Sequence, residues 1–363
     1  MNFTKRLFAV LLSLILVFSL ASCSKIPTGE EPTTEEETTT EPPKIINPLT
    51  GEDGLNPEYV GKRPIAVTIQ NNIICRPQWG LGSADITIEA EVEGTETKQL
   101  WIYQDPTQLE KGGPFRSVRV DFVEMAMGFD AILVHCGWSS GVSYGAKELL
   151  TKTGYDHIDG GSTGYKVGSE NGIWFRDSTA PDGKKRGVEY RSYTKGANID
   201  KYLKSEKGSK IRREVKAAYS EPMNFYEEKT ALTGGACNKI TFKVGKHTYH
   251  WDYNETDGLY YGNYGEKELK ANDGTKFAVE NVVVLYLKSV KVMDKKGRVD
   301  MDLSGGTGVV ASNGTYQNIT WTKSGQNDMF KFYNEDGTEF KFNTGKTYIG
   351  LSRTSYSGKT SIA

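Results

Sequence analysis

Alternating hydrophobic and polar residues predict strands in the first part of the folded chain. Residues 84–93, ADITIEAEVE, alternate without interruption between apolar side chains and acidic residues or threonine. Because successive side chains of a strand point to opposite faces, we predict a strand with one apolar face and one polar face, which carries Asp85 and Glu89. Residues 65–70 and 100–104 predict two further strands.

A helical spacing of apolar residues follows these strands. Apolar residues recur every three or four positions over 115–128, which predicts a helix with one face packed on the sheet. Residues 131–135 predict a buried strand, and 142–152 a second helix that ends near Gly154. The order of these elements predicts a mixed arrangement of helices and strands.

The pattern changes after residue 207. Short strand-like runs follow one another, separated by turn residues; Asn-Gly and Asp-Gly pairs at 257–258, 313–314 and 336–337 indicate hairpins. The charged segment 201–216 is a connector. We therefore predict an α+β fold with two domains: residues 47–207 form an α+β domain, and residues 208–363 a mostly antiparallel β domain.

The N-terminus predicts export and lipid anchoring. Residues 1–22 combine two basic residues with an apolar run of the length of a secretory signal. The run ends in Leu20-Ala21-Ser22-Cys23, the pattern of a bacterial lipobox, so Cys23 is the expected lipidation site. Acyl chains such as palmitate would hold the protein at the outer face of the bacterial cell membrane. The alternative is an ordinary signal peptide in which Cys23 occurs by chance.

Composition separates a tether from the folded part. Residues 23–46 are rich in Thr, Glu and Pro and have no apolar periodicity, so we predict a disordered, extended tether. The whole chain has a formal charge of −1, which argues against a nucleic-acid binder. Cys75, Cys136 and Cys237 lie far apart and show no metal-ligand spacing, so we predict no metal and no cofactor, and leave one disulfide among them open.

The stretch GGPFRSVRVDF, residues 112–122, contains the main candidate site. If the helix starts here, Arg116 and Arg119 lie near its first turn, where the helix dipole disfavours cations. One explanation is internal pairing with the acidic face of the 84–93 strand, including Asp85 and Glu89. The other is an external anion, because a guanidinium group binds carboxylate or phosphate through two hydrogen bonds.

His135 is a further candidate residue, at the end of the predicted strand that follows the arginine-containing helix. It ends a buried strand and precedes a glycine-containing loop and a helix, which is a common setting for ligand sites in folds of strands and helices. The alternative is a structural histidine at the end of a strand.

Several segments resemble the family of YerB-like lipoproteins. They include RPIAVTIQNN, RPQWGLGSADITIEAEVEG, GPFRSVR and HCGWS in the first domain and ITWTK in the second. The resemblance implies an N-terminal α+β domain with a layered β-β-α sandwich, followed by a β domain, and implies no established reaction. The polar positions of the shared motifs are Asn71, Arg76, Asp85, Glu89, Arg116, Arg119 and His135. EYRSYTK at 189–195 lacks the histidine that this family often has there.

The sequence supports three hypotheses about function. The leading one is a membrane-anchored extracytoplasmic lipoprotein that binds an anionic envelope ligand or a protein partner without catalysis, around Arg116, Arg119 and His135. The second is a hydrolase or transferase acting on the cell wall, with Glu89 or Asp85 as a base beside His135. The third is a structural subunit of an envelope complex.

Overall fold

The structure is a computed structural model that describes residues 43–141 and 144–363. The predicted signal peptide, the lipidation site Cys23 and most of the predicted tether lie outside these residues. Residues Lys44–Ala363 form one compact unit. Within the described part of the chain, no helix has the length and apolar character needed to cross a membrane.

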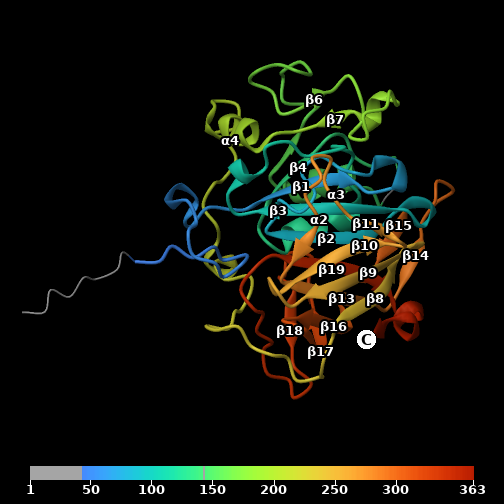
Figure 1. The fold of residues 1–363 in the computed structure, drawn as a ribbon. Helices are drawn as coiled ribbons and strands as arrows, with labels where there is room; N and C mark the ends of the chain where they lie inside the picture. The colour runs from blue at the N-terminus through green and yellow to red at the C-terminus, as the bar shows by residue number, and fades with distance from the viewer. Residues whose placement is uncertain (1–42, 142–143) are drawn as a thin grey trace, which may run out of the picture. The chain divides into compact units, whose positions relative to one another are not determined.

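A mixed ten-stranded sheet runs through this unit (Figure 1). Strand pairing is antiparallel except at β13–β19, β19–β2, β1–β4 and β4–β5, which are parallel. In spatial order the strands are β18 (Lys331–Tyr333), β17 (Thr315–Thr322), β16 (Gly305–Ser312), β13 (Asn281–Leu287), β19 (Thr347–Arg353), β2 (Ile86–Glu91), β3 (Thr97–Tyr103), β1 (Ile65–Gln70), β4 (Ile132–His135) and β5 (His157–Asp159).

The sheet joins the two halves of the chain. Strand β2 from the first half pairs with β19 from the second, from Ile86↔Thr347 to Glu89↔Gly350. The predicted boundary between residues 207 and 208 therefore does not separate two sheets. The coarse expectation of a sheet-rich α+β fold is confirmed, whereas the second half contains the parallel pair β13–β19 beside its antiparallel hairpins.

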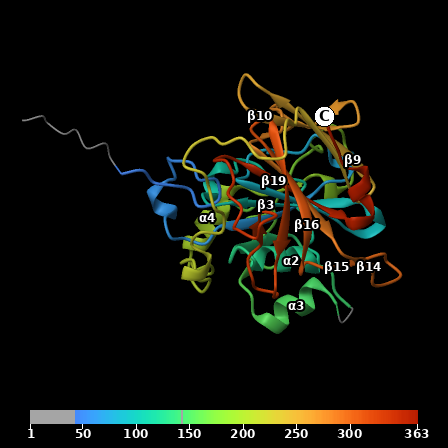
Figure 2. The same cartoon turned by 90° about the horizontal axis from the view of Figure 1, so that it is seen from below.

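Different elements cover the two faces of this sheet (Figure 2). Helix α2 packs on one face, where Ile88, Leu100 and Phe122 share a buried apolar cluster. The opposite face carries Val67 and Trp101, which share a second cluster with Trp251 of the smaller sheet. Both faces of the central strands are therefore buried, and all six residues of β2 are buried, including its acidic ones.

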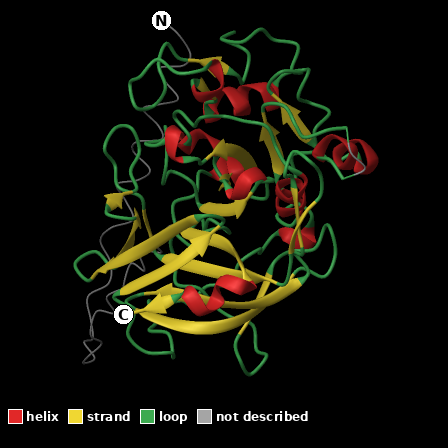
Figure 3. Ribbon diagram, turned by 90° about the vertical axis from the view of Figure 1, so that its right-hand side faces the viewer, coloured by secondary structure: helices red, strands yellow, loops and turns green. Residues whose placement is uncertain are grey.

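A six-stranded sheet supplies the second layer, and the helices are short (Figure 3). The six-stranded sheet contains β11 (Lys267–Glu268), β10 (Leu259–Tyr264), β9 (His247–Asn254), β8 (Lys239–Val244), β20 (Ser361–Ile362) and β12 (Ala278–Val279). Two ribbons pair β14 (Val290–Val292) with β15 (Val299–Met301) and β6 (Phe175–Arg176) with β7 (Ser192–Tyr193). The α-helices are α2 (Val120–Met127), α3 (Ala146–Thr153) and α4 (Gly196–Lys204).

The hairpin predictions are confirmed where turn chemistry is strong. Asn313 and Gly314 both have positive φ, 49° and 67°, and connect β16 to β17. Asp257-Gly258 lies in the turn between β9 and β10. Gly154 ends α3 in the left-handed conformation. In these places the sequence requires a backbone conformation that Gly and Asn adopt at low cost.

Candidate functional site

The two arginines of the candidate site do not lie together in a first helical turn. Helix α2 begins at Val120, so Arg119 is its N-cap residue and Arg116 lies in extended chain before it. The N–H of Arg116 donates to the carbonyl of Thr68, and its carbonyl accepts from the N–H of Cys136. Because these backbone groups pair with neighbouring strands, they are not available for helical bonds. The predicted start of this helix is therefore wrong.

Arg119 forms an ion pair with Glu93. Its Nε donates to Oε1 of Glu93, and its Nη1 donates to the carbonyl of Val118 at 3.2 Å. The side chains of the ion pair remain 22% and 25% exposed. The carboxylate of Glu93 offsets both the guanidinium charge and the positive end of α2. Internal pairing thus explains Arg119.

A third cation, Lys98, lies beside the arginines. It belongs to β3, on the same face as Leu100 of the helix-covered apolar cluster, and is only 3% exposed. Its Nζ donates to Oε1 of Gln70. Burial, together with the charges of Arg119 and Arg116, holds the pKa of Lys98 well below its usual range. We call Lys98, Arg116 and Arg119 the cationic cluster.

In the described residues, neither Lys98 nor Arg116 has an ion-pair partner, and the two differ in their hydrogen bonds. Within residues 43–141 and 144–363, the guanidinium group of Arg116 has no hydrogen-bond or ion-pair partner, and its side chain is partly exposed. Its charge lies near the free thiols of Cys75 and Cys136, but burial raises the pKa of each thiol to about 12. The thiols are therefore protonated at neutral pH and are poor nucleophiles.

His135 lies inside the protein and uses both ring nitrogens there. Its Nδ1 donates to the carbonyl of Gly137 at 2.8 Å, so its Nε2 accepts from Nδ1 of His157 at 2.9 Å. The two rings stack, with centroids 5.1 Å apart. Burial and the neighbouring His157 lower the pKa of His135 to about 4. The neutral His135 ring therefore orders the loop that follows β4.

Glu89 anchors a different polar network, on the opposite face of the sheet. The fully buried carboxylate accepts hydrogen bonds from the Tyr249 hydroxyl at 2.6 Å, from Nε2 of Gln99 at 3.0 Å and from the Tyr348 hydroxyl at 3.2 Å. Tyr249 and Tyr348 come from β9 and β19. Three donors satisfy this acid, which joins the central strands to the second half of the chain.

Asn71 and Arg76 extend this network. Nη2 of Arg76 donates to the Tyr249 hydroxyl at 2.6 Å, and its Nε donates to Oδ1 of Asn71 at 3.3 Å. The same Oδ1 accepts from Nε2 of Gln78 at 2.7 Å, and Nδ2 of Asn71 donates to Thr97 at 2.9 Å. We call Glu89, Asn71, Arg76, Gln78, Gln99, Tyr249 and Tyr348 the buried network.

Asp85 belongs to neither group. It lies just before β2, where Oδ1 accepts from Nδ2 of Asn47 at 3.1 Å and Oδ2 accepts from the N–H of Gln104 at 2.7 Å. Burial raises its pKa to about 6. Its bonds hold the start of the folded chain against the sheet, away from the arginines.

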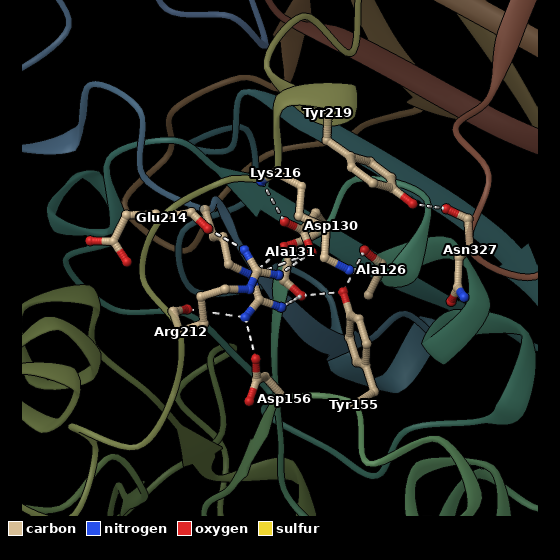
Figure 4. Close-up of polar contacts among 11 residues, drawn as sticks. Ala126, Asp130, Ala131, Tyr155, Asp156, Arg212, Glu214, Lys216, Tyr219 and Asn327 are labelled. Carbon is tan, nitrogen blue, oxygen red and sulfur yellow. Dashed lines mark hydrogen bonds and ion pairs between the residues drawn. The ribbon is translucent and has the colours of Figure 1, made fainter.

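A polar cluster at another edge of the sheet is also internally paired (Figure 4). Asp130 accepts from Nη2 of Arg212 at 2.6 Å and from the N–H of Lys216 at 3.1 Å, while the buried Arg63 donates to Asp156. A cavity of about 230 Å³ lies beside these residues. Because Asp130 accepts from Arg212 and from the backbone of Lys216, both in the 201–216 connector, the cluster fastens this connector to the sheet.

Two family models match the chain. The model described as "Protein of unknown function (DUF3048) N-terminal domain" matches residues 49–210, and the C-terminal domain of the same family matches residues 239–349. The Bacillus subtilis (strain 168) protein named "Putative lipoprotein YerB" is 30% identical over 320 residues, covering 85% of this chain and 86% of the relative. The chain belongs to the DUF3048 family.

A solved member of this family has the same fold. The crystal structure of YerB from Bacillus subtilis matches with a TM-score of 0.71 at 28% identity, covering 88% of this chain and 100% of that chain. The resemblance drawn from the sequence motifs is therefore confirmed, as is the sheet-rich α+β class. The family description leaves its function open.

The structure brings together some of the predicted site residues and separates others. Arg116 and Arg119 lie in one cationic cluster, whereas Glu89, Arg76 and Asn71 meet in the buried network. Sequence reasoning missed Lys98 and His157. Lys98 had a detectable signal, because it occupies an apolar-face position in the alternation that continues through Leu100 and Ile102. In the described residues, no group of three or more His, Cys, Asp or Glu side chains is arranged to hold a metal ion.

Proposed function

We propose that this DUF3048 protein is a lipid-anchored extracytoplasmic protein that binds an anionic ligand of the cell envelope at the cationic cluster, without catalysis. The signal-like residues 1–22 and the lipobox that ends at Cys23 support export and anchoring. The related Bacillus protein carries the name "Putative lipoprotein YerB". The ligand is a phosphate- or carboxylate-bearing wall polymer or small molecule.

The observation that carries this proposal is a charge imbalance. Three cations lie together, one of them nearly fully buried, and Glu93 is the carboxylate bonded to the group in the described residues. A buried cation beside like charges is costly, and a counter-ion lowers this cost. An anion that reaches Arg116 and Arg119 would gain charge-assisted hydrogen bonds and also offset the charge of Lys98.

The positions of the acids favour binding over catalysis. The catalytic alternative needs Glu89 or Asp85 close to His135. Glu89, however, faces Tyr249 of the second sheet. His135 points to the opposite, helix-covered face, because it lies two residues after Leu133 on the same strand. No hydrogen bond joins either acid to His135 in the described residues. An exposed aromatic patch would favour the structural-subunit alternative, but the large hydrophobic side chains exposed in residues 43–141 and 144–363 are Ile, Val and Met and include no aromatic ring.

Calorimetric titration tests the proposal. The segment 44–363, which is the compact unit, is titrated with inorganic phosphate, pyrophosphate and poly(glycerol phosphate). We expect binding that weakens as salt concentration rises, and at least tenfold weaker binding by Arg116→Ala. The matched control is Lys341→Ala, which removes one exposed cation beside β18, at the far edge of the sheet.

Two results would overturn this site. One is no binding of any of the three probes at millimolar concentration. The other is equal loss of affinity in Arg116→Ala and Lys341→Ala, because such a result reports net charge and not a defined cluster.

A further inference from the structure

A cavity lies between the first half of the chain and the hairpin of β10 and β11. Its volume is about 570 Å³, which is within the range of small-molecule sites. The backbone around Gln78 runs beside Ala271, and the N–H of Asn272 donates to the carbonyl of Gln78 at 2.9 Å. The cavity is therefore built by two segments that a backbone contact holds together, at the outer edge of the buried network.

Two side chains that line this cavity have unused hydrogen-bonding atoms. Arg76 donates through Nε and Nη2, but its Nη1 is buried and has no partner among the described residues. Gln78 is fully buried and donates through Nε2, but its Oε1 also has no partner in the described part of the chain. Leaving such atoms unpaired costs about 1–3 kcal/mol each, more for a charged group.

The rest of the lining combines an aromatic ring, apolar groups and charges. The Tyr264 ring lies over the Arg76 guanidinium, 4.7 Å from its central carbon. Ile73 is 55% exposed and Leu269 is buried, so the apolar lining extends from the surface inward.

Exposed residues from β11 and its flanks complete the rim. Lys267 and Lys270 line the rim together with Glu266 and Glu268, and Glu268 is paired with Lys276. With Arg76 included, the lining residues carry one more positive than negative charge, which suits a ligand with a single negative charge.

We propose that this cavity binds a small carboxylate that has an N–H or O–H donor next to its carboxyl group. The carboxylate accepts from Nη1 of Arg76, the neighbouring donor bonds to Oε1 of Gln78, and the body of the ligand lies against Tyr264. The C-terminal residue of a short peptide has its N–H on the carbon that bears the carboxyl group, and a hexuronic sugar acid has its nearest hydroxyl one carbon further along the ring. The site is independent of the cationic cluster and takes a different ligand, so either can fail without the other.

Ligand pairs that differ in one group test the chemistry. The segment 44–363 is titrated with N-acetyl-alanyl-alanine and with its C-terminal amide, and separately with glucuronate and with glucose. We expect each carboxylate to bind at least tenfold more tightly than its neutral counterpart, and the tighter carboxylate identifies the source. The proposal is overturned if neither carboxylate binds at millimolar concentration or if the amide binds as well as the acid.

Substitutions then locate the site. Ile73→Glu adds a negative charge at an exposed position of the lining and should weaken carboxylate binding at least tenfold, whereas the neutral Ile73→Gln should change it less than threefold. Arg76→Lys keeps the charge, removes Nη1 and should also weaken binding at least tenfold. Arg76→Lys also disturbs the buried network and could leave the protein unfolded. In that case, the comparison of Ile73→Glu with Ile73→Gln decides the location of the site. Equal binding by the two Ile73 variants would place the ligand elsewhere.

Discussion

Lys98 and Gln99 are neighbours on β3 and lie in opposite electrostatic environments. Gln99 faces the second sheet, where it donates to a Glu89 carboxylate that also receives two tyrosine hydroxyls. Lys98 faces the helix-covered side, where its companions are two more cations and a glutamine oxygen. One face of the sheet thus holds a satisfied acid, and the other holds an excess of positive charge.

This difference distinguishes residues of the same motifs whose contacts are internal from residues that carry unbalanced charge. Polar residues of the buried network join strands from both halves of the chain, which explains Asn71, Glu89 and the Nε and Nη2 contacts of Arg76 by folding. In the described residues, the one carboxylate bonded to the cationic cluster is Glu93, which engages Arg119 alone, so Lys98 and Arg116 lack such an internal explanation. We therefore attribute a structural role to the first group, and the proposed binding concerns the second.

The largest expected effect concerns Asp121, a fully buried acid of α2. Its Oδ1 accepts from the N–H of Met301 at 2.8 Å, and burial raises its pKa to about 8. A raised carboxyl pKa means that the folded state holds the proton more tightly, so stability is full below about pH 4 and falls as pH rises to about 8. The free energy of unfolding should fall by about 1.4 kcal/mol per pH unit, and on the order of 5 kcal/mol over the whole range.

Asp121→Asn should remove this pH dependence. Urea unfolding of both proteins between pH 4 and 9 measures it, and the variant should gain relative stability as pH rises. A constant difference across this range would mean that Asp121 is ionised in the folded protein.

Removal of the central acid of the buried network should destabilise the protein strongly. Glu89→Ala leaves three buried donors without an acceptor, and we expect a loss of about 3 kcal/mol or more in the free energy of unfolding. Urea unfolding at pH 7 checks this value. A loss below 1 kcal/mol would mean that the network contributes little to the joint between β2 and the second sheet.

Removal of the buried Lys98 should stabilise the protein, in contrast to removal of Glu89. Lys98→Met takes a charge away from two arginines and from an apolar surrounding, so we expect a gain of about 1 kcal/mol in stability. The same variant should bind pyrophosphate more weakly. A clear loss of stability, or unchanged pyrophosphate affinity, would contradict the assignment of Lys98 to binding.

The smallest expected effect is that of the surface ion pair. Glu93→Ala should change stability by less than about 1 kcal/mol, because Glu93 and Arg119 are partly exposed. The variant frees Arg119 and should tighten pyrophosphate binding. Weaker binding by Glu93→Ala would show that Glu93 orients Arg119 for the ligand.

Local patterns predicted most strands of the first half, because their information lies within a few residues. The alternation of 84–93 predicted β2 and assigned Asp85 and Glu89 to one face, but it did not reveal what covers that face. The partners Tyr249 and Tyr348 come from strands more than 150 residues away in sequence, and only the fold brings them close.

The start of α2 and the charge cluster show two other limits. Apolar spacing predicted a helix from residue 115, but pairing of residues 115–118 with β1 and the loop after β4 competes with it and prevails. The excess of positive charge became visible only when β3 brought Lys98 beside the arginines. The signal for this cluster in the sequence was Lys98, a lysine on the apolar face of a predicted strand.

Nuclear magnetic resonance of the Lys98 side chain, with and without pyrophosphate, tests the central claim most directly. The free protein should show a Lys98 pKa well below the ordinary lysine value. If an anion binds at the cationic cluster, saturation with pyrophosphate should raise this pKa, because a nearby negative charge favours the protonated amine. A Lys98 pKa that stays the same in saturating pyrophosphate would contradict the claim.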